Sequence, residues 1–199
     1  MTSPYTPLVS SPLESGVTIH RLDRVFMDVV SLDAPASVVM TDLRKVTAVT
    51  ISGAASIEVA IQRMKQRGVR LLLVVDDNDV IFGLITSTDL QGEKPMQHIQ
   101  KHGGKHSDIL VRDIMTRQEK LEVLCMADVE RAKVGDIVET LKYSGRQHAL
   151  VVDRLEPNKP QVLRGIFSAA QVARQLDMEI QTNEIAKTFA EIESLLINA

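Results

Sequence analysis

The sequence predicts an α+β (α/β) fold built from two copies of one β-α-β-β-α unit. The first observation is an internal repeat, in which positions 57–76 reappear as 134–153 with Gly68 matched by Gly145 (145 − 68 = 77). The second is composition, since 44% of the 199 residues are hydrophobic and only 3% are aromatic, which predicts an aliphatic core. Because neither copy alone can bury a good core, the two should pack together and leave a cleft between them.

The apolar pattern assigns the elements of the first copy. Ser56 is a favourable N-cap and Gly68 a favourable terminator for a helix whose apolar residues recur at i, i+3, i+4 and i+7. The continuous apolar run 71–75 fits a strand covered on both faces, and the polar turn 76–79 makes a hairpin with the next strand. The predicted elements are a short helix at 35–40, strands at 46–51, 71–75 and 80–85, and helices that end at Gly68 and begin at Thr86.

The second copy repeats this order, and the segments around the copies set the domain boundaries. Its strands are predicted at 121–125, 149–153 and 163–167, and its helices at 134–142 and 169–176. Pro95, Gly103 and Gly104 interrupt a polar segment between the copies, which is typical of a linker. We expect an N-terminal arm at 1–34, a first unit at 35–92, a linker at 93–109, a second unit at 110–177 and an amphipathic helix at 178–199.

Composition and motifs exclude several classes of function. A net charge of −3 and a pI near 6.0 provide no basic field for nucleic acid or an acidic membrane. The longest apolar run, 71–75, is far shorter than the roughly 20 residues of a spanning helix. The single Cys125 and the polar start of the chain, without a leader, favour a cytoplasmic location. No G-x-S-x-G, H-E-x-x-H or P-loop motif occurs, and Cys125 falls in an apolar strand where burial is common, so we expect no catalytic residue.

A candidate phosphate and ribose site lies where the second hairpin strand of the first copy gives way to a helix. Backbone N–H groups at a helix start attract phosphate, and Thr86 can donate its hydroxyl to the same anion. Asp89, one turn into the helix, has two carboxylate oxygens that can accept both hydroxyls of a ribose. Thr86-x-x-Asp89 is equally a capping box, in which the two side chains only satisfy the helix start.

The second copy provides a comparison at the same place. Ser168 and Gln171 replace Thr86 and Asp89, and because a glutamine offers one acceptor oxygen we expect a weaker or empty ribose site there. Basic groups precede the first hairpin strand of each copy, namely Arg70 in one and Arg146 and His148 in the other. Since charge-assisted hydrogen bonds exceed the helix-dipole contribution, arginine should decide phosphate affinity, unless these side chains are simply solvated strand ends.

These motifs resemble the cystathionine β-synthase (CBS) domain pair, or Bateman module, over about residues 35–176. The most diagnostic pieces are the VVDD and VVD strands, followed at set distances by GLITSTD at 83–89 and GIFSAAQ at 165–171. The openings 38–41 (VVMT) and 113–116 (DIMT) of the two halves agree with this. The resemblance implies two units packed about a pseudo-twofold axis, with adenosine ligands such as AMP, ADP, ATP or S-adenosylmethionine in the clefts.

The resemblance also implies roles for residues in this sequence. In one cleft it implies that Asp89 holds the ribose, that Thr86 and Arg70 face the phosphate, and that His148 approaches from the other half. The adenine would lie against the backbone of 122–125, a segment that includes Val123 and Cys125. In the second cleft Ser168 and Arg146 match the family pattern, whereas Gln171 departs from it.

The sequence therefore predicts a non-catalytic sensor that needs no cofactor and binds an adenine nucleotide as a regulatory ligand. It would act as a homodimer and signal in trans to a protein partner. An alternative is a structural or interaction module of the same fold with unoccupied clefts. A third is a metal sensor, because His98, His102 and His106 recur every fourth residue, although Gly103 and Gly104 interrupt a helix that would align them.

Overall fold

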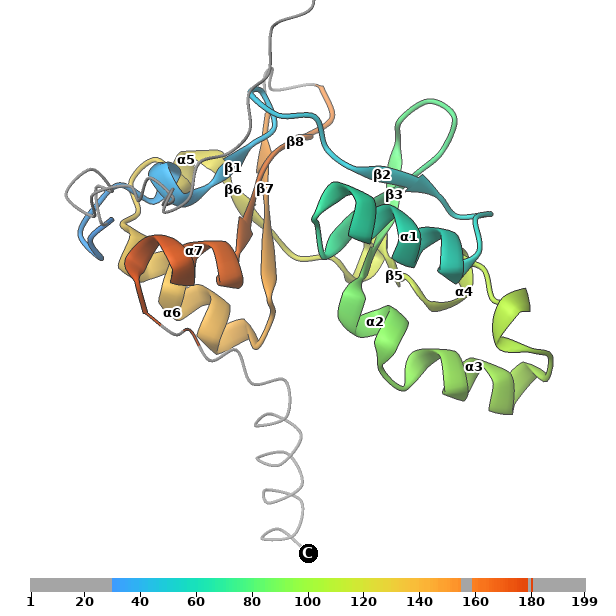
Figure 1. Ribbon diagram of the computed structural model, residues 1–199. Helices are drawn as coiled ribbons and strands as arrows, with labels where there is room; N and C mark the ends of the chain where they lie inside the picture. Colours follow the sequence, from blue (N-terminus) through green and yellow to red (C-terminus); the bar gives the residue numbers. More distant parts are fainter. Residues whose placement is uncertain (1–29, 155–158, 179, 181–199) are drawn as a thin grey trace, which may run out of the picture.

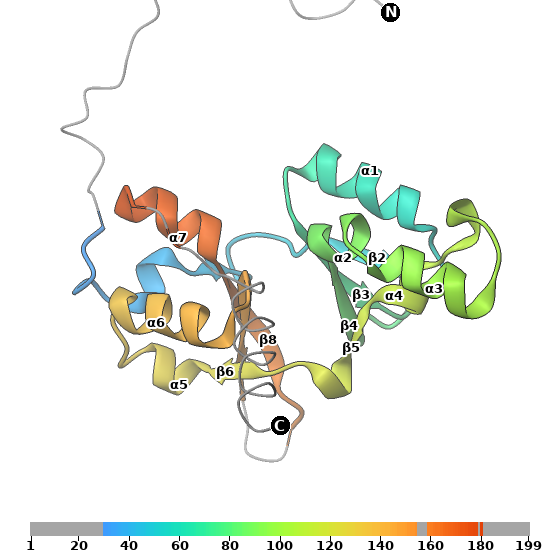
Figure 2. The ribbon, with the colours of Figure 1, turned by 90° about the horizontal axis from the view of Figure 1, so that it is seen from below.

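The computed structural model describes residues 30–154, 159–178 and 180, which form two lobes (Figure 1). Most of the predicted N-terminal arm, 1–29, and most of the predicted terminal helix, 181–199, lie outside the described residues. Each lobe contains a four-stranded sheet, one in the order β2-β3-β4-β5 and the other in the order β1-β8-β7-β6. The sheets face one another and the helices lie on their outer sides (Figure 2). None of the helices in the described ranges has the length and apolarity to cross a bilayer.

The first lobe is defined here as the sheet β2-β3-β4-β5 with its helices, and the second lobe as the sheet β1-β8-β7-β6 with its helices. The first lobe consists of β2 (Thr50–Ser52), α1 (Ile57–Arg67), β3 (Leu71–Val75), β4 (Ile81–Thr86), α2 (Ser87–Gln91), α3 (Lys94–His102), η3 (His106–Asp108), α4 (Val111–Ile114) and β5 (Thr116–Arg117). The second lobe consists of η2 (Ala36–Val39), β1 (Thr41–Asp42), β6 (Val123–Cys125), α5 (Met126–Val129), α6 (Val134–Ser144), β7 (His148–Asp153), β8 (Val162–Ser168) and α7 (Ala169–Leu176). The short helix η4 (Gln118–Lys120) follows β5 and contacts β4 of the first lobe.

The fold class predicted from the repeat is confirmed. The two sheet orders correspond when β2, β3, β4 and β5 are matched with β6, β7, β8 and β1, as an approximate twofold relation requires. The capping residues in the sequence correctly predicted where these helices begin and end. Ser56 Oγ accepts a hydrogen bond from the Val59 amide (3.3 Å), and both Gly68 and Gly145 end their helices in the left-handed conformation at φ 64°.

Three segments differ in detail from the predicted elements. The strand predicted at 46–51 pairs only at Thr50–Ser52, because the chain crosses from one lobe to the other over residues 43–49. The segment 93–109, predicted as a linker, contains helix α3. Pro95 does not prevent this helix because it lies in the first turn, where proline is tolerated, and Gly103 lies at its end. Cys125 is exposed, contrary to the expected burial, because it lies at the end of the short strand β6.

Three clusters of buried apolar side chains hold the molecule together. One lies between sheet and helices in each lobe, and the third lies between the two sheets. The third cluster contains Leu71, Leu73 and Leu150, which explains why these strands carry continuous apolar runs. The two copies therefore pack on each other, as their small size required.

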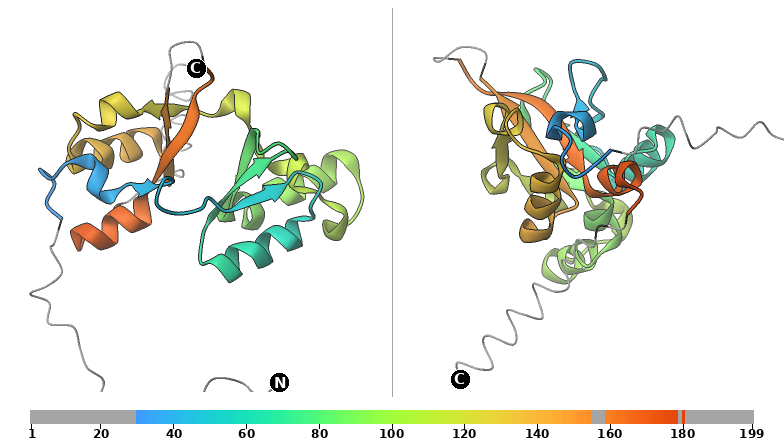
Figure 3. Two further views of the ribbon diagram at one scale, coloured as in Figure 1. Left: turned by 90° about the horizontal axis from the view of Figure 1, so that it is seen from above. Right: turned by 90° about the vertical axis from the view of Figure 1, so that its left-hand side faces the viewer.

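Each copy of the sequence repeat lends its opening segment to the other lobe. Strand β1 pairs antiparallel with β8, and strand β5 pairs antiparallel with β4, so two chain segments cross between the lobes (Figure 3). Two glycines permit these close approaches. A Cβ on Gly83 would lie 2.7 Å from the Thr116 carbonyl oxygen, and one on Gly165 would collide with the Met40 side chain. Arg164, 5% exposed, donates to both carboxylate oxygens of Asp42 and fixes β1 to β8.

Candidate functional site

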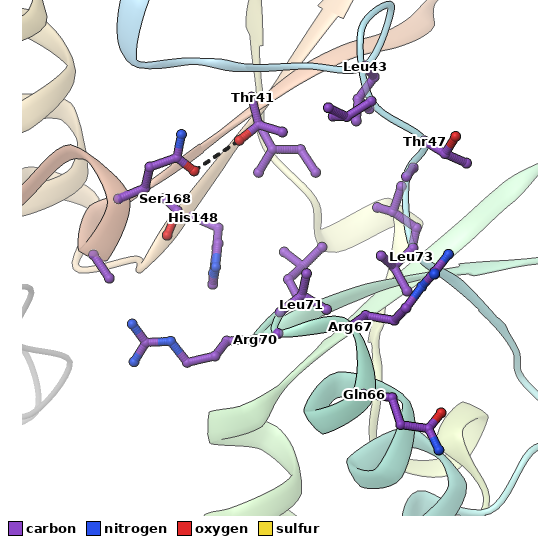
Figure 4. Close-up of a pocket in the computed structure, with 18 of the residues that line it drawn as sticks. Thr41, Leu43, Thr47, Gln66, Arg67, Arg70, Leu71, Leu73, His148 and Ser168 are labelled. Atoms are coloured by element: carbon purple, nitrogen blue, oxygen red, sulfur yellow. Dashed lines mark hydrogen bonds between the residues drawn. The ribbon is translucent and has the colours of Figure 1, made fainter. Parts of the chain in front are cut away.

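A cavity of about 540 Å³ lies between the lobes at the start of β3 and the end of β8 (Figure 4). Residues of both lobes line this cavity, which is called the interlobe pocket below. Its apolar side consists of Leu71 and Leu73 from the first lobe, Ile166 from the second, and the crossing segment 46–49. Its polar side combines Arg70, His148, Ser168 and Gln171.

Strand pairing and helix starts position the polar side chains of this interlobe pocket. His148 opens β7 and stands opposite Ser168 in the antiparallel register, so the two side chains meet at one edge of the sheet. Ser168 then precedes α7, whose first turn presents Gln171. The Thr41 hydroxyl donates to the Gln171 side-chain oxygen at 3.1 Å, which ties β1 to α7 (Figure 4).

The electrostatics of the interlobe pocket favour an anion. Arg67, Arg70 and Arg174 line it, and none of the described residues in its wall is acidic. Figure 4 shows Arg70 on the same side as His148 and Arg67 on the opposite side. Burial of the His148 imidazole, with the positive charge of Arg70 as a second cause, lowers its pKa from 6.5 to about 4. His148 is therefore neutral at pH 7 and available as a hydrogen-bond partner rather than a cation.

Thr86 and Asp89 do not line this pocket but form a capping box at the start of α2. The Asp89 amide donates to Thr86 Oγ1 at 3.2 Å, and Asp89 Oδ2 accepts from the Thr86 amide and hydroxyl, both at 2.8 Å. The Asp89 carboxylate also pairs with Lys94 Nζ at 2.5 Å. The capping box that the sequence allowed is thus formed in the structure, and Lys94 is a partner of Asp89 that sequence reasoning missed.

The remaining predicted residues lie elsewhere. Arg146 pairs with Glu122 at 3.0 Å instead of joining Ser168. Val123 is 43% exposed and lines a different hollow of about 1130 Å³ near the hairpin turns, while Cys125 lines neither cavity. The structure therefore combines Arg70 and His148, expected in the first cleft, with Ser168 and Gln171, expected in the second.

Some residues of the interlobe pocket were missed at the sequence level although signals for them existed. Thr41 closes the VVMT opening and corresponds to Thr116 in DIMT, so the repeat already marked both positions. Arg174 follows Gln171 by one helical turn and thus shares its face of α7. What the sequence could not indicate was which opening segment reaches which lobe.

The three linker histidines do not come together in the structure. Helix α3 brings the rings of His98 and His102 to a centroid separation of 4.7 Å, but His106 lies beyond the helix end and faces Glu58 at 3.9 Å. The part of the chain that the structure describes contains no group of three or more histidine, cysteine or acidic side chains arranged to hold a metal ion.

Comparisons with known proteins find relatives of the same fold. Residues 29–93 match the family model of the CBS domain. Inosine-5'-monophosphate dehydrogenase from Yersinia pestis is 32% identical over 126 residues, which cover 62% of this chain and 25% of that enzyme. The chain thus spans about a quarter of the length of this curated relative.

Two solved structures share the fold. An uncharacterized conserved protein from Pyrococcus horikoshii has a TM-score of 0.53 and 21% identity, covering 77% of this chain and 100% of that one. CBSX2 from Arabidopsis thaliana, in complex with AMP, has a TM-score of 0.50 and 23% identity, covering 71% and 94%. Residues 29–93 thus resemble a CBS domain, and the described part of the chain has the fold of a tandem CBS pair.

Proposed function

We propose that this protein is a non-catalytic regulatory module that binds an adenine nucleotide in the interlobe pocket and relays its occupancy to a protein partner. The observation that carries the proposal is the pocket itself, which joins an apolar wall to three arginines and a helix start, with no acidic side chain in its described wall. The crystallised complex of the structural neighbour CBSX2 with AMP supports the choice of ligand class.

Each part of a nucleotide has a chemical counterpart in the pocket. The phosphates would meet Arg70 and the start of α7, where Ser168 offers a hydroxyl and the helix dipole is positive. The ribose would lie by the Thr41–Gln171 pair, which has both a donor and an acceptor to share. The adenine would lie along the crossing segment 46–49 and against Leu73.

The proposed signal is a change in the relation between the lobes. A ligand that contacts both lobes binds best to one arrangement of them, and it shifts the population toward that arrangement. We further propose that the protein acts as a cytoplasmic homodimer and signals in trans. This proposal rests on the proposed function and on the composition of the chain, and not on a contact among the described residues.

Isothermal titration calorimetry with ATP, ADP, AMP and adenosine tests the proposal. We expect binding of the three nucleotides and much weaker binding of adenosine, because the arginines recognise phosphate. Arg70→Ala should raise the Kd about 10- to 100-fold, the equivalent of a charge-assisted hydrogen bond of about 1.5–3 kcal/mol. The matched control is Arg112→Ala, an exposed arginine on α4 outside the pocket, which should bind like the parent. Absence of heat with every adenylate on folded protein would refute the proposal.

One observation favours the alternative of an interaction module with unoccupied clefts. The Thr86–Asp89 capping box satisfies its own polar groups, so this motif needs no ligand to explain it. The two functions differ in a thermal melt. Nucleotide at a hundredfold over its Kd should stabilise a binding protein by roughly 2.7 kcal/mol, whereas an interaction module shows no nucleotide-dependent shift.

A further inference from the structure

The carboxylate of Asp89 is almost fully used by the protein itself. Its Oδ2 accepts two hydrogen bonds from Thr86, and its Oδ1 lies 2.5 Å from Lys94 Nζ. A carboxylate has about four acceptor positions, so three of the four are already taken. Both hydroxyls of a ribose diol need an acceptor, and Asp89 cannot supply two while Lys94 stays in place.

Lys94 is held where it is by more than this one contact. It is the first residue of α3, and the following Pro95 is buried. Its ammonium group also lies 3.5 Å from the Thr116 hydroxyl on β5, the strand that the second copy contributes to the first lobe. The Lys94 side chain therefore links α2 to β5 and occupies a side of the Asp89 carboxylate that a ribose at this motif, here called the cleft of the first lobe, would need.

In the second lobe the residue at the position that corresponds to Lys94 is not a cation, and Arg174 of α7 lines the interlobe pocket. Gln171 matches Asp89 and Thr41 matches Thr116, and those two side chains form a neutral hydrogen bond. Lys94 stands five residues after Asp89 (94 − 89), and the residue five after Gln171 (176 − 171) is Leu176, which packs against the apolar core. Leu176 does not line the interlobe pocket, so the polar wall around Ser168 is open to a ligand.

From this asymmetry we infer that Lys94 closes the cleft of the first lobe, so that the protein takes one nucleotide per chain, in the interlobe pocket beside Ser168 and Gln171. The inference rests on the proposed nucleotide binding and adds which of the two repeated motifs is used. It makes Lys94 a specificity-determining residue and gives Asp89 a structural role, although Asp89 has the side chain better suited to a ribose.

Calorimetric stoichiometry with ATP tests the inference on the full chain. We expect one site per chain in the parent. Lys94→Met keeps the length of the side chain but removes its charge, and it should reveal a second, weaker site that vanishes again in the double variant Lys94→Met/Asp89→Asn. The matched control is Lys101→Met on the same helix, where the lysine is exposed and far from Asp89 in sequence; it should keep one site.

The outcomes separate the two levels of the proposal. A parent with no site refutes nucleotide binding itself, whereas a parent with two sites, or a folded Lys94→Met variant with one, overturns only the role of Lys94. If Lys94→Met does not fold, Asp89→Asn in the parent decides, since asparagine can still cap α2. An unchanged Kd and a single site support the inference, and loss of binding would mean that Asp89 holds the ribose.

Discussion

Among single residues, His148 should make the free energy of unfolding depend on pH. Its pKa falls to about 4 in the folded protein because burial and Arg70 disfavour the imidazolium, while in the unfolded chain it returns to about 6.5. Between pH 6.5 and 4 the unfolded state therefore binds a proton that the folded state does not. The free energy of unfolding should fall as the pH drops through this window, and His148 should have no effect above it.

Urea denaturation at pH 7, 5.5 and 4.5 checks this expectation on the parent and on His148→Gln, which stays neutral throughout. The parent should lose more stability than the variant between pH 7 and 4.5. The carboxylates of Asp33 and Asp42, whose pKa values are lowered by hydrogen bonds from Lys133 and Arg164, lose their contribution only at lower pH. Parallel pH profiles for the two proteins would contradict the assignment to His148.

Gly83 illustrates a residue whose identity is fixed by a neighbour distant in sequence. An added Cβ would lie 2.7 Å from the backbone oxygen of Thr116 and 2.8 Å from Met115 Sδ, and backbone cannot move aside cheaply. Gly83→Ala should therefore cost about 1–3 kcal/mol of stability in chemical denaturation. Gly135→Ala is the control, because it lies inside α6 with its nearest neighbour at 3.4 Å and alanine favours a helix. Equal effects of the two substitutions would rule out the crowding by β5.

At the scale of elements, an ion pair supports the exchanged strand β1 in addition to its backbone pairing with β8. Strand β1 has only two residues, and Arg164 holds it through both oxygens of Asp42. Removing one partner of a buried pair leaves the other charge uncompensated, which costs more than removing both. Asp42→Ala should lower the Tm, and the double variant Asp42→Ala/Arg164→Met should recover part of the loss. A double variant less stable than the single one would show that the pair itself is the main stabilising contribution.

The elements that the sequence predicted correctly are those decided by nearby residues. The caps at Ser56, Gly68 and Gly145 and the apolar run of β3 depend only on local chemistry and periodicity. Helix α3 was missed because Pro95 and Gly103 are helix breakers in general but are harmless at the first turn and at the end. Strand β2 is shorter than predicted because a crossing between lobes, and not β propensity, sets its start.

For the whole molecule, the repeat predicted two packed units and a pocket between them, and the structure has both. The grouping of site residues could not be predicted, because a repeat shows which segments are equivalent but not which lobe each one joins. The exchange of β1 and β5 decides that Thr41 meets Gln171 and that Thr116 meets Lys94. The polar environment of each motif is therefore determined by contacts between residues far apart in the sequence.

The exchanged strands also constrain the order in which a nascent chain can mature on the ribosome. The sheet that starts at Thr50 is complete only after Arg117 has been synthesised, and β1 has no partner until β8 emerges more than a hundred residues later. Each sheet needs one strand from the other copy of the sequence repeat before it is complete. Both sheets are therefore complete only late in translation.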